Sequence, residues 1–485
     1  MIRRLAVPVF ALVFALGTGT AFAQAAPLTL EEVLRSSARS APQIVEALAR
    51  VRQAEGRALS AQGAFDTVFD VDGQTRLTSY YTSYYDGTEV EGRATRPFTN
   101  NGGYLYGSYQ VSRGRFPIYE DQNYTNQLGQ FKVGGLYALL RDRVIDERRT
   151  RRALAGKDID VARFEAEMVA IGVQRRAVDA YQNWVAAGLR LQAYRDLLAL
   201  AEKRRGGIGR QIALGARPAI LLTENDQNLV RRRGLVTRAE QDLSSTANAL
   251  SLYLRDDAGT PITVSAERLP ADAKALTGLA GVNRAVAATA RPDYQTVLNR
   301  IDQATTRLML AQNDLSPRLD LRGEMSKDVG RIGPGGSSRT PFEAIVGFRF
   351  TVPLQNRAAK GRIAEAQAEL SALDQRSRFL RDQIAVEVEG IVIAVTGAER
   401  LAAIAEQERS LADRLAAAER REFELGAADF FLVNQREETA NDARVRLIDA
   451  QARIASARAE LAAATADREA LLIPAAPAAG VGADQ

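Results

Sequence analysis

The chain has 485 residues, contains no Cys and no His, and carries a formal net charge of +5. Ser-His-Asp triads, cysteine nucleophiles and nearly all zinc sites require one of these two missing residues, so we expect no catalytic residue, no metal ion and no cofactor. The surplus of positive charge is too small for a chain of this length to indicate nucleic-acid binding.

The N-terminus has the pattern of a secretory signal peptide. Arg3 and Arg4 precede an apolar run over residues 5–16, and residues 21–23 read Ala-Phe-Ala, a small-x-small cleavage site. The apolar run is too short to cross a bilayer as a helix. We therefore expect residues 1–23 to be removed on export. A lipid anchor at the cleavage point would need a Cys, so none is expected.

Helical and strand patterns alternate through the first half of the chain. A helical pattern over residues 28–63 restarts at Pro42. Period-2 alternation then predicts a strand over about residues 65–80 and a returning strand over about residues 126–139. Between them, residues 87–123 are rich in Gly, Asn, Thr and Tyr and are predicted to form a long loop.

A very long helical pattern follows these strands. It runs from residue 143 to about residue 205, reaches a turn over about residues 206–218, and returns as a helix over residues 218–254. At a rise of 1.5 Å per residue, roughly 65 residues would reach about 95 to 100 Å. The richness in Ala, Arg, Glu and Gln favours side-by-side packing of helices in a coiled-coil-like wall.

The second half repeats this plan, so the chain is a duplication. Residues 41–73 recur at 291–323 with one constant offset of 250, as in Pro42 and Pro292 or Gly73 and Gly323. At the returning strands the offset falls to 213, so the first loop is longer by 250 minus 213, or 37 residues. The second copy predicts strands over about residues 317–327 and 342–354, long and returning helices over 358–424 and 429–472, and a turn over about 424–430.

The repeats define the domain organisation. We assign residues 24–270 to the first repeat, residues 271–472 to the second, and residues 473–485 to a disordered tail. No segment of the mature chain offers about 20 consecutive apolar residues, so we expect any part within a membrane to consist of strands.

Four strands per chain cannot close a barrel, and open strand edges in lipid cost several kcal/mol per unpaired backbone group. Three copies would supply twelve strands, an even number within the range of outer-membrane barrels. Ten of the fourteen Tyr residues lie between positions 80 and 137. This clustering predicts an interfacial aromatic girdle, and a Tyr-rich soluble hairpin is the alternative. The candidate girdle residues are Tyr80, Tyr81, Tyr104, Tyr106 and Tyr137.

Specific runs resemble the TolC-like outer-membrane efflux family. Residues 346–354 read Val-Gly-Phe-Arg-Phe-Thr-Val-Pro-Leu and, with residues 362–370, are similar to the family's returning strand and helix start. Residues 139–143 resemble the counterpart in the first half. The resemblance covers about residues 28–472 and implies an α+β membrane protein. Its homotrimer would join a 12-stranded outer-membrane β-barrel to a 12-helix periplasmic α-barrel, with four strands and two helical hairpins per chain.

The resemblance also implies a function. The chain would be the outer-membrane channel of a tripartite efflux or type I secretion system, extending through the periplasm as a passive conduit. An inner-membrane pump would supply the energy, and a periplasmic adaptor, or membrane fusion protein, would dock on the helical tips. The alternative is a soluble periplasmic coiled-coil adaptor or scaffold, which would normally carry one helical hairpin flanked by compact β domains.

Two Leu-Gly-Ala turns resemble the helical-hairpin tips of the family, although each Gly could simply permit a tight turn. The adaptor-contacting residues would be Leu214, Gly215, Ala216, Leu425, Gly426 and Ala427. The family often has an acidic residue six positions after this Gly, where this chain has Leu221 and Leu432. Asp429 is an alternative acidic candidate but also a candidate helix N-cap. The candidate entrance constriction therefore consists of Leu221, Asp429, Phe431 and Leu432.

Overall fold

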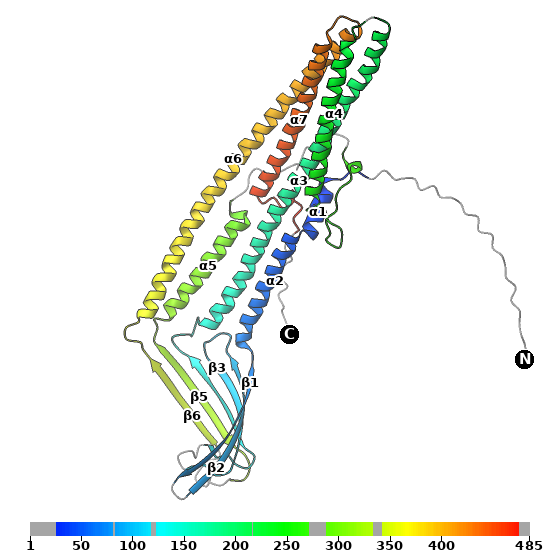
Figure 1. Ribbon diagram of the computed structural model, residues 1–485. Coiled ribbons are helices and arrows are strands. Elements are labelled where there is room, and N and C mark those ends of the chain that lie inside the picture. The colour runs from blue at the N-terminus through cyan, green and yellow to red at the C-terminus, as the bar shows by residue number, and fades with distance from the viewer. Residues whose placement is uncertain are drawn as a thin grey trace, which may run out of the picture.

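The computed structural model shows an elongated molecule with an antiparallel sheet at one end and two helical hairpins that reach the other end (Figure 1). The structure describes residues 26–80, 83–117, 123–215, 217–270, 288–332 and 342–474. The predicted signal peptide, residues 475–485 of the predicted tail, Tyr81 and Ala216 lie outside the described residues.

Three shorter helices lie between the sheet and the middle of the molecule. They are α1 (Leu30–Ser40), α2 (Pro42–Gln62) and α5 (Pro292–Asn313). The Thr29 hydroxyl caps α1 by accepting a hydrogen bond from the Glu32 amide at 3.2 Å. Pro42 and Pro292 lie in the first turns of α2 and α5, where a missing N–H costs no helical hydrogen bond. The predicted restart at Pro42 is confirmed.

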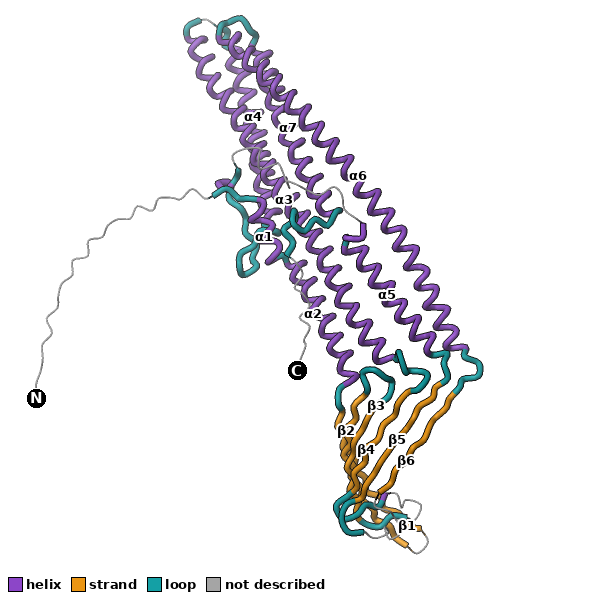
Figure 2. Tube along the Cα trace, turned by 180° about the vertical axis from the view of Figure 1, so that it is seen from behind, coloured by secondary structure: helices purple, strands orange, loops and turns teal. Residues whose placement is uncertain are grey.

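The two predicted long helices are present, although the first continues to Ala213, so the predicted turn over about residues 206–218 is wrong in its first eight residues. They are α3 (Glu147–Ala213), with 67 residues, and α6 (Arg357–Glu424), with 68 residues. Each is followed by a shorter returning helix, α4 (Ile220–Leu250) or α7 (Phe430–Ala464). Figures 1 and 2 show α2 and α4 along successive stretches of α3, and α5 and α7 along successive stretches of α6. The short helices therefore complete two columns of similar height.

The sheet contains six strands, each hydrogen-bonded to its neighbours in chain order. The strands are β1 (Val68–Tyr80), β2 (Ser83–Pro97), β3 (Tyr104–Arg113), β4 (Gln130–Ala138), β5 (Arg318–Asp328) and β6 (Phe342–Thr351). Every neighbouring pair is antiparallel. The four predicted strands correspond to β1, β4, β5 and β6, with ends shifted by a few residues.

The predicted long loop over residues 87–123 is wrong, and so is the prediction of four strands per chain. Most of that stretch forms β2 and β3, which lie between β1 and β4. Val90, Gly92 and Ala94 alternate with charged neighbours in β2, but Gly and Ala give a weak apolar signal. Strands of a membrane sheet characteristically show such weak alternation. The expected α+β fold with long helices is confirmed.

The largest apolar core lies where α1, α3, α4 and α7 meet. Trp184 is fully buried there and functions as a packing residue. Its neighbours in this core include Leu28, Val33, Tyr181, Leu191, Leu243, Leu250 and Ile448. Residues near the beginning of the described chain thus pack against the middle of α3, in the same core that joins α4 and α7.

We predict that Tyr181→Phe lowers the free energy of unfolding by about 1 kcal/mol. The Tyr181 hydroxyl donates a hydrogen bond to the Leu28 carbonyl at 2.9 Å, and both residues are buried. Burial also raises the pKa of Tyr181 to about 12, so the phenol remains a donor at neutral pH. Thermal unfolding followed by circular dichroism measures the change. An unchanged midpoint would show that this hydrogen bond does not stabilise the fold.

Candidate functional site: a two-faced sheet and two helical tips

One face of the sheet is apolar and exposed. The strand register places alternate residues of all six strands on this face, from Phe69 and Val71 in β1 to Phe348 in β6. Their side chains are exposed although they are large and apolar. We call this the apolar face, and its exposed members include Phe69, Val71, Leu77, Val90, Leu105, Tyr109, Phe131, Val133, Tyr137, Leu321, Met325, Phe342, Val346, Phe348 and Phe350.

The opposite face is polar and partly buried. Asp320 is only 1% exposed, and several uncharged polar residues of β3, β4 and β5 are also buried. We call this the polar face, and its buried members are Ser108, Gln110, Ser112, Gln130, Asp320, Ser326 and Asp328. A soluble protein shows the opposite arrangement, with apolar side chains inside and polar ones outside.

Hydrogen bonds between neighbouring strands link side chains of the polar face. Lys132 donates to the Gln110 side chain at 2.8 Å, which joins β4 to β3. Gln110 donates to Glu89 of β2 at 3.3 Å. Gln130 donates to Asp328 of β5 at 3.1 Å. These bonds connect β2, β3, β4 and β5 into one polar surface that can border water.

Strand length and polarity together fit a sheet that spans a bilayer. The six strands contain between 9 and 15 residues. A tilted strand needs about 9–11 residues to cross the hydrocarbon core. An apolar face toward lipid and a polar face toward a water-filled interior is the pattern of outer-membrane barrels.

The structure places the predicted girdle residues on opposite faces of the sheet. Tyr137 lies on the apolar face, where a ring at the membrane interface is expected. Tyr104 and Tyr106 lie on the polar face, and the Tyr106 hydroxyl donates a hydrogen bond to Glu324 of β5. These two residues therefore do not belong to an outer girdle. The sequence alternation alone could not show this because it leaves open which face is which.

The two helical turns lie together at the end of the molecule farthest from the sheet (Figure 1). Gly215 has φ +72° and Gly426 has φ +83°, a backbone conformation that favours Gly, so both residues are required by their turns. Leu214 and Leu425 precede them and are 84% and 79% exposed. Each tip thus presents a large apolar side chain that has no role in the protomer's core.

The candidate constriction residues have different surroundings. The Asp429 carboxylate accepts a hydrogen bond from the Phe431 amide at 3.3 Å and caps α7. Leu221 packs against the apolar cluster formed by Ile208, Phe423, Phe430 and Val433 below the tips. Leu432 is partly exposed, and Phe431 is 71% exposed. Phe431 and Asp429 are therefore the two exposed candidates, and Phe431 is the apolar one.

A buried ion cluster just below the tips is a further feature of the structure that was not predicted. Glu437 of α7 is 2% exposed and forms ion pairs with Arg204 of α3 and with Arg232 of α4, the latter at 3.2 Å. Arg232 is itself 1% exposed and also donates to the Leu197 carbonyl at 2.8 Å. Burial lowers the pKa of the Arg232 guanidinium, and the Glu437 carboxylate opposes that shift. One carboxylate thus links both helical hairpins.

Membrane-spanning helices and metal sites can be assessed for the part of the chain that the structure describes. Within it, no helix is both long enough and apolar enough to cross a membrane. In the same residues, no group of three or more acidic side chains is placed to hold a metal ion.

Comparison with known proteins identifies a matching family model and solved structures with the same fold. The family model described as outer membrane efflux protein matches residues 285–467. A membrane protein from Pseudomonas aeruginosa has 14% identity and a TM-score of 0.63 over 90% of this chain and 93% of that one. The outer membrane protein VceC of Vibrio cholerae has 14% identity and a TM-score of 0.60, with 90% and 95% covered. The MtrE outer membrane channel of Neisseria gonorrhoeae, in an open state, has 12% identity and a TM-score of 0.61, with 96% and 97% covered.

These likenesses establish the fold over nearly the whole length of the known structures. A comparison with curated protein sequences finds no match. The fold of a sheet joined to paired long helices is thus shared with the outer membrane protein VceC and the MtrE outer membrane channel. The match to the model described as outer membrane efflux protein lies within the second repeat, and the solved structures extend the similarity in fold to both repeats.

Proposed function

We propose that three copies of the chain close into a passive conduit that carries export substrates from an inner-membrane pump and a periplasmic adaptor across the outer membrane. The observation that carries this proposal is the inverted polarity of the sheet, which requires lipid on one side and water on the other. The helical columns would extend the conduit through the periplasm. The family is one of channels, and we assign the chain no catalytic role.

The sheet supports closure by further copies. β1 and β6 are the end strands, and within the described residues neither pairs with another strand on its outer side. Unpaired backbone groups in lipid cost several kcal/mol each, so these edges need partners. The β6 edge of one copy can pair with the β1 edge of the next, which closes the sheet without a free edge.

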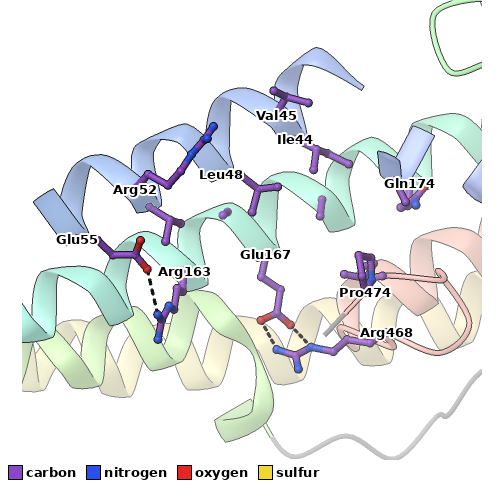
Figure 3. A pocket seen from close by; sticks show the side chains of 15 residues that line it. Ile44, Val45, Leu48, Arg52, Glu55, Arg163, Glu167, Gln174, Arg468 and Pro474 are labelled. Atoms are coloured by element: carbon purple, nitrogen blue, oxygen red, sulfur yellow. Dashed lines mark hydrogen bonds and ion pairs between the residues drawn. The ribbon is translucent and has the colours of Figure 1, made fainter. Parts of the chain in front are cut away.

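The helices have two matching edges. At one edge a groove of about 500 Å³ runs between α2, α3 and the chain near Pro474, with Val45 and Leu48 exposed on its α2 side (Figure 3). At the other edge, α6 exposes Phe379, Val386 and Ile393, which repeat every seven residues. A seven-residue apolar repeat is the pattern of a coiled-coil seam. We assign both edges to contacts between neighbouring copies.

The test of this function is the assembly and conductance of the purified protein. We expect trimer bands in unheated gel samples that become monomer bands after boiling, outer-membrane residence in cell fractionation, and single-channel conductance in planar bilayers. A periplasmic monomer without conductance would contradict the proposal. That outcome would favour the soluble adaptor, which the exposed apolar face of the sheet argues against.

We further propose that the tips dock the adaptor, because Leu214 and Leu425 are exposed and contribute nothing to the protomer's core. Changing both to Arg is expected to abolish adaptor capture while trimers still form, since a charged side chain would have to be desolvated in an apolar contact. Crosslinking in cells followed by purification and mass spectrometry measures capture of the adaptor and pump.

The matched control for the tips is Val144→Arg. Val144 is 82% exposed but lies in the segment between the end of β4 and the start of α3, so an apolar residue is changed to Arg far from the tips. We expect this variant to capture the adaptor as the unaltered chain does. Equal capture by the double tip variant would show that docking uses another surface.

A further inference from the structure

We propose that β2 and β3 of every copy are wall strands of the barrel, so that the closed trimer has three times six, or eighteen, strands rather than twelve. This inference rests on the proposed trimeric channel and adds the composition of its wall. The expectation of twelve strands assumed four strands per chain and treated the 37 additional residues of the first repeat as a loop.

Strand pairing is the first support. β1 pairs with β2 over its whole length from Val68 to Tyr80, and β2 pairs with β3 from Thr88 to Pro97 without a break. β3 then pairs with β4 from Tyr104 to Gln110. In an arrangement with twelve strands, β1 would instead pair directly with β4. The structure shows two complete strands between them.

The pattern of side chains is the second support. On the apolar face, β2 contributes Val90 and Ala94, and β3 contributes Leu105, Gly107 and Tyr109. Residues between these positions lie on the polar face and are mostly charged or hydroxylated. A loop outside the membrane would have no reason to continue the same two faces as its neighbours. The added hairpin has the polarity that lipid contact demands.

Contacts on the polar face are the third support. Gln110 of β3 accepts a hydrogen bond from Lys132 of β4 and donates one to Glu89 of β2. The Tyr106 hydroxyl reaches across β4 to Glu324 of β5. The added strands therefore share one hydrogen-bonded interior surface with strands that the second repeat also has.

The wider wall is compatible with the helices that it joins. Strands about 4.8 Å apart and tilted by about 40° give eighteen strands a circumference on the order of 110 Å. Twelve helices packed about 8–10 Å apart give about 100–120 Å. Barrel diameter grows roughly linearly with strand number, so the exit would be about half again as wide as that of a twelve-stranded barrel.

Cysteine pairs can separate the two arrangements, because the chain has no Cys of its own. Gly73 and Val90 are partners in β1 and β2, and Gly107 and Val133 are partners in β3 and β4. In a barrel of twelve strands β1 would pair directly with β4, and the internal repeat predicts which of their residues would be partners. Gly323 and Val346 are partners in β5 and β6, and their counterparts in the first repeat are Gly73 and Val133.

The experiment crosslinks these pairs with a short thiol-reactive reagent in outer-membrane trimers. Both Gly sites have room, since an added Cβ would meet Val90 at 3.6 Å at position 73 and Lys132 at 3.9 Å at position 107. We expect crosslinks for Gly73→Cys with Val90→Cys and for Gly107→Cys with Val133→Cys. We expect none for Gly73→Cys with Val133→Cys, which are separated by three strand spacings and four residues of register, or about 20 Å.

Gly323→Cys with Val346→Cys is the positive control, because β5 and β6 are neighbours in both arrangements. If the Gly73 and Val90 pair does not assemble, Thr75→Cys with Thr88→Cys tests the same two strands, since these hydroxyls lie 3.1 Å apart. A crosslink between positions 73 and 133, or failure of the pairs that join β1 to β2 and β3 to β4 in assembled trimers, would overturn the inference. The proposed channel would stand in that case, because trimers and conductance are measured separately.

Discussion

Glu437→Ala is expected to lower the free energy of unfolding of the helical part by about 3–5 kcal/mol, the usual effect of removing one partner of a buried ion pair. Glu437 and Arg232 are almost completely buried, and Arg cannot lose its proton in a protein. Without the carboxylate, Arg232 keeps its charge in a site from which water is excluded. Thermal unfolding followed by the helical circular dichroism signal measures the loss.

Two variants separate this effect from a simple loss of charge. Glu438→Ala removes an acidic neighbour whose ion pair with Arg231 is partly exposed, and exposed pairs contribute about 0–1 kcal/mol. Glu437→Gln retains a hydrogen-bond acceptor of similar size and is expected to fall between the two. A Glu437→Ala effect no larger than that of Glu438→Ala would show that the buried cluster does not hold the hairpins together.

The buried ion cluster lies where it can hold the helices of both hairpins together. Glu437 lies on α7 and contacts Arg204 of α3, Arg232 of α4 and, at 3.8 Å, Arg420 of α6. All four helices of the two hairpins are therefore joined a few turns below the tips. Loss of Glu437 should also make the tips more susceptible to proteolysis, while the sheet end remains protected.

The helices and the tips could be predicted from the sequence because their determinants are local. Pro42 marks the start of a helix, and Gly215 and Gly426 mark the turns. The repeat then fixed the equal lengths of the two columns. The sequence also contained a sign of the buried cluster: Glu437 lies between Val433 and Ala440 in the buried stripe of α7. Its partners come from other helices, however, and no local pattern identifies them.

The strands β2 and β3 were missed for a physical reason. A strand that faces lipid on one side needs only moderate apolarity there, and close packing of strands admits Gly92 and Gly107 on the apolar face. Gly and Asn are frequent in turns and loops, so the composition of this stretch suggested a loop, although its Tyr and Thr residues favour strands. The alternation of Glu89 and Glu91 with Val90 was the available signal. Only the register with Leu105, Tyr109 and their neighbours shows that the two faces continue.

Phe348→Arg is expected to prevent assembly in the outer membrane. Phe348 lies on the apolar face near the middle of β6 and is 76% exposed. An Arg at the bilayer midplane on the lipid face costs about 2–4 kcal/mol. A trimer would carry this cost three times, so its total is comparable with the net stability of a whole domain, about 5–15 kcal/mol. We therefore expect at least a tenfold loss of trimer bands in membrane fractions.

Ile345→Arg is the matched control on the same strand. Ile345 is also apolar and exposed, but its partner across the sheet is Glu324 on the polar face. An Arg at this position would face water and lie beside a carboxylate, so trimers should form at the normal level and only conductance or ion selectivity should change. If both variants assembled equally well, the apolar face would not contact lipid. If both failed, β6 would be intolerant of Arg on either face and the assignment of its two faces would be wrong.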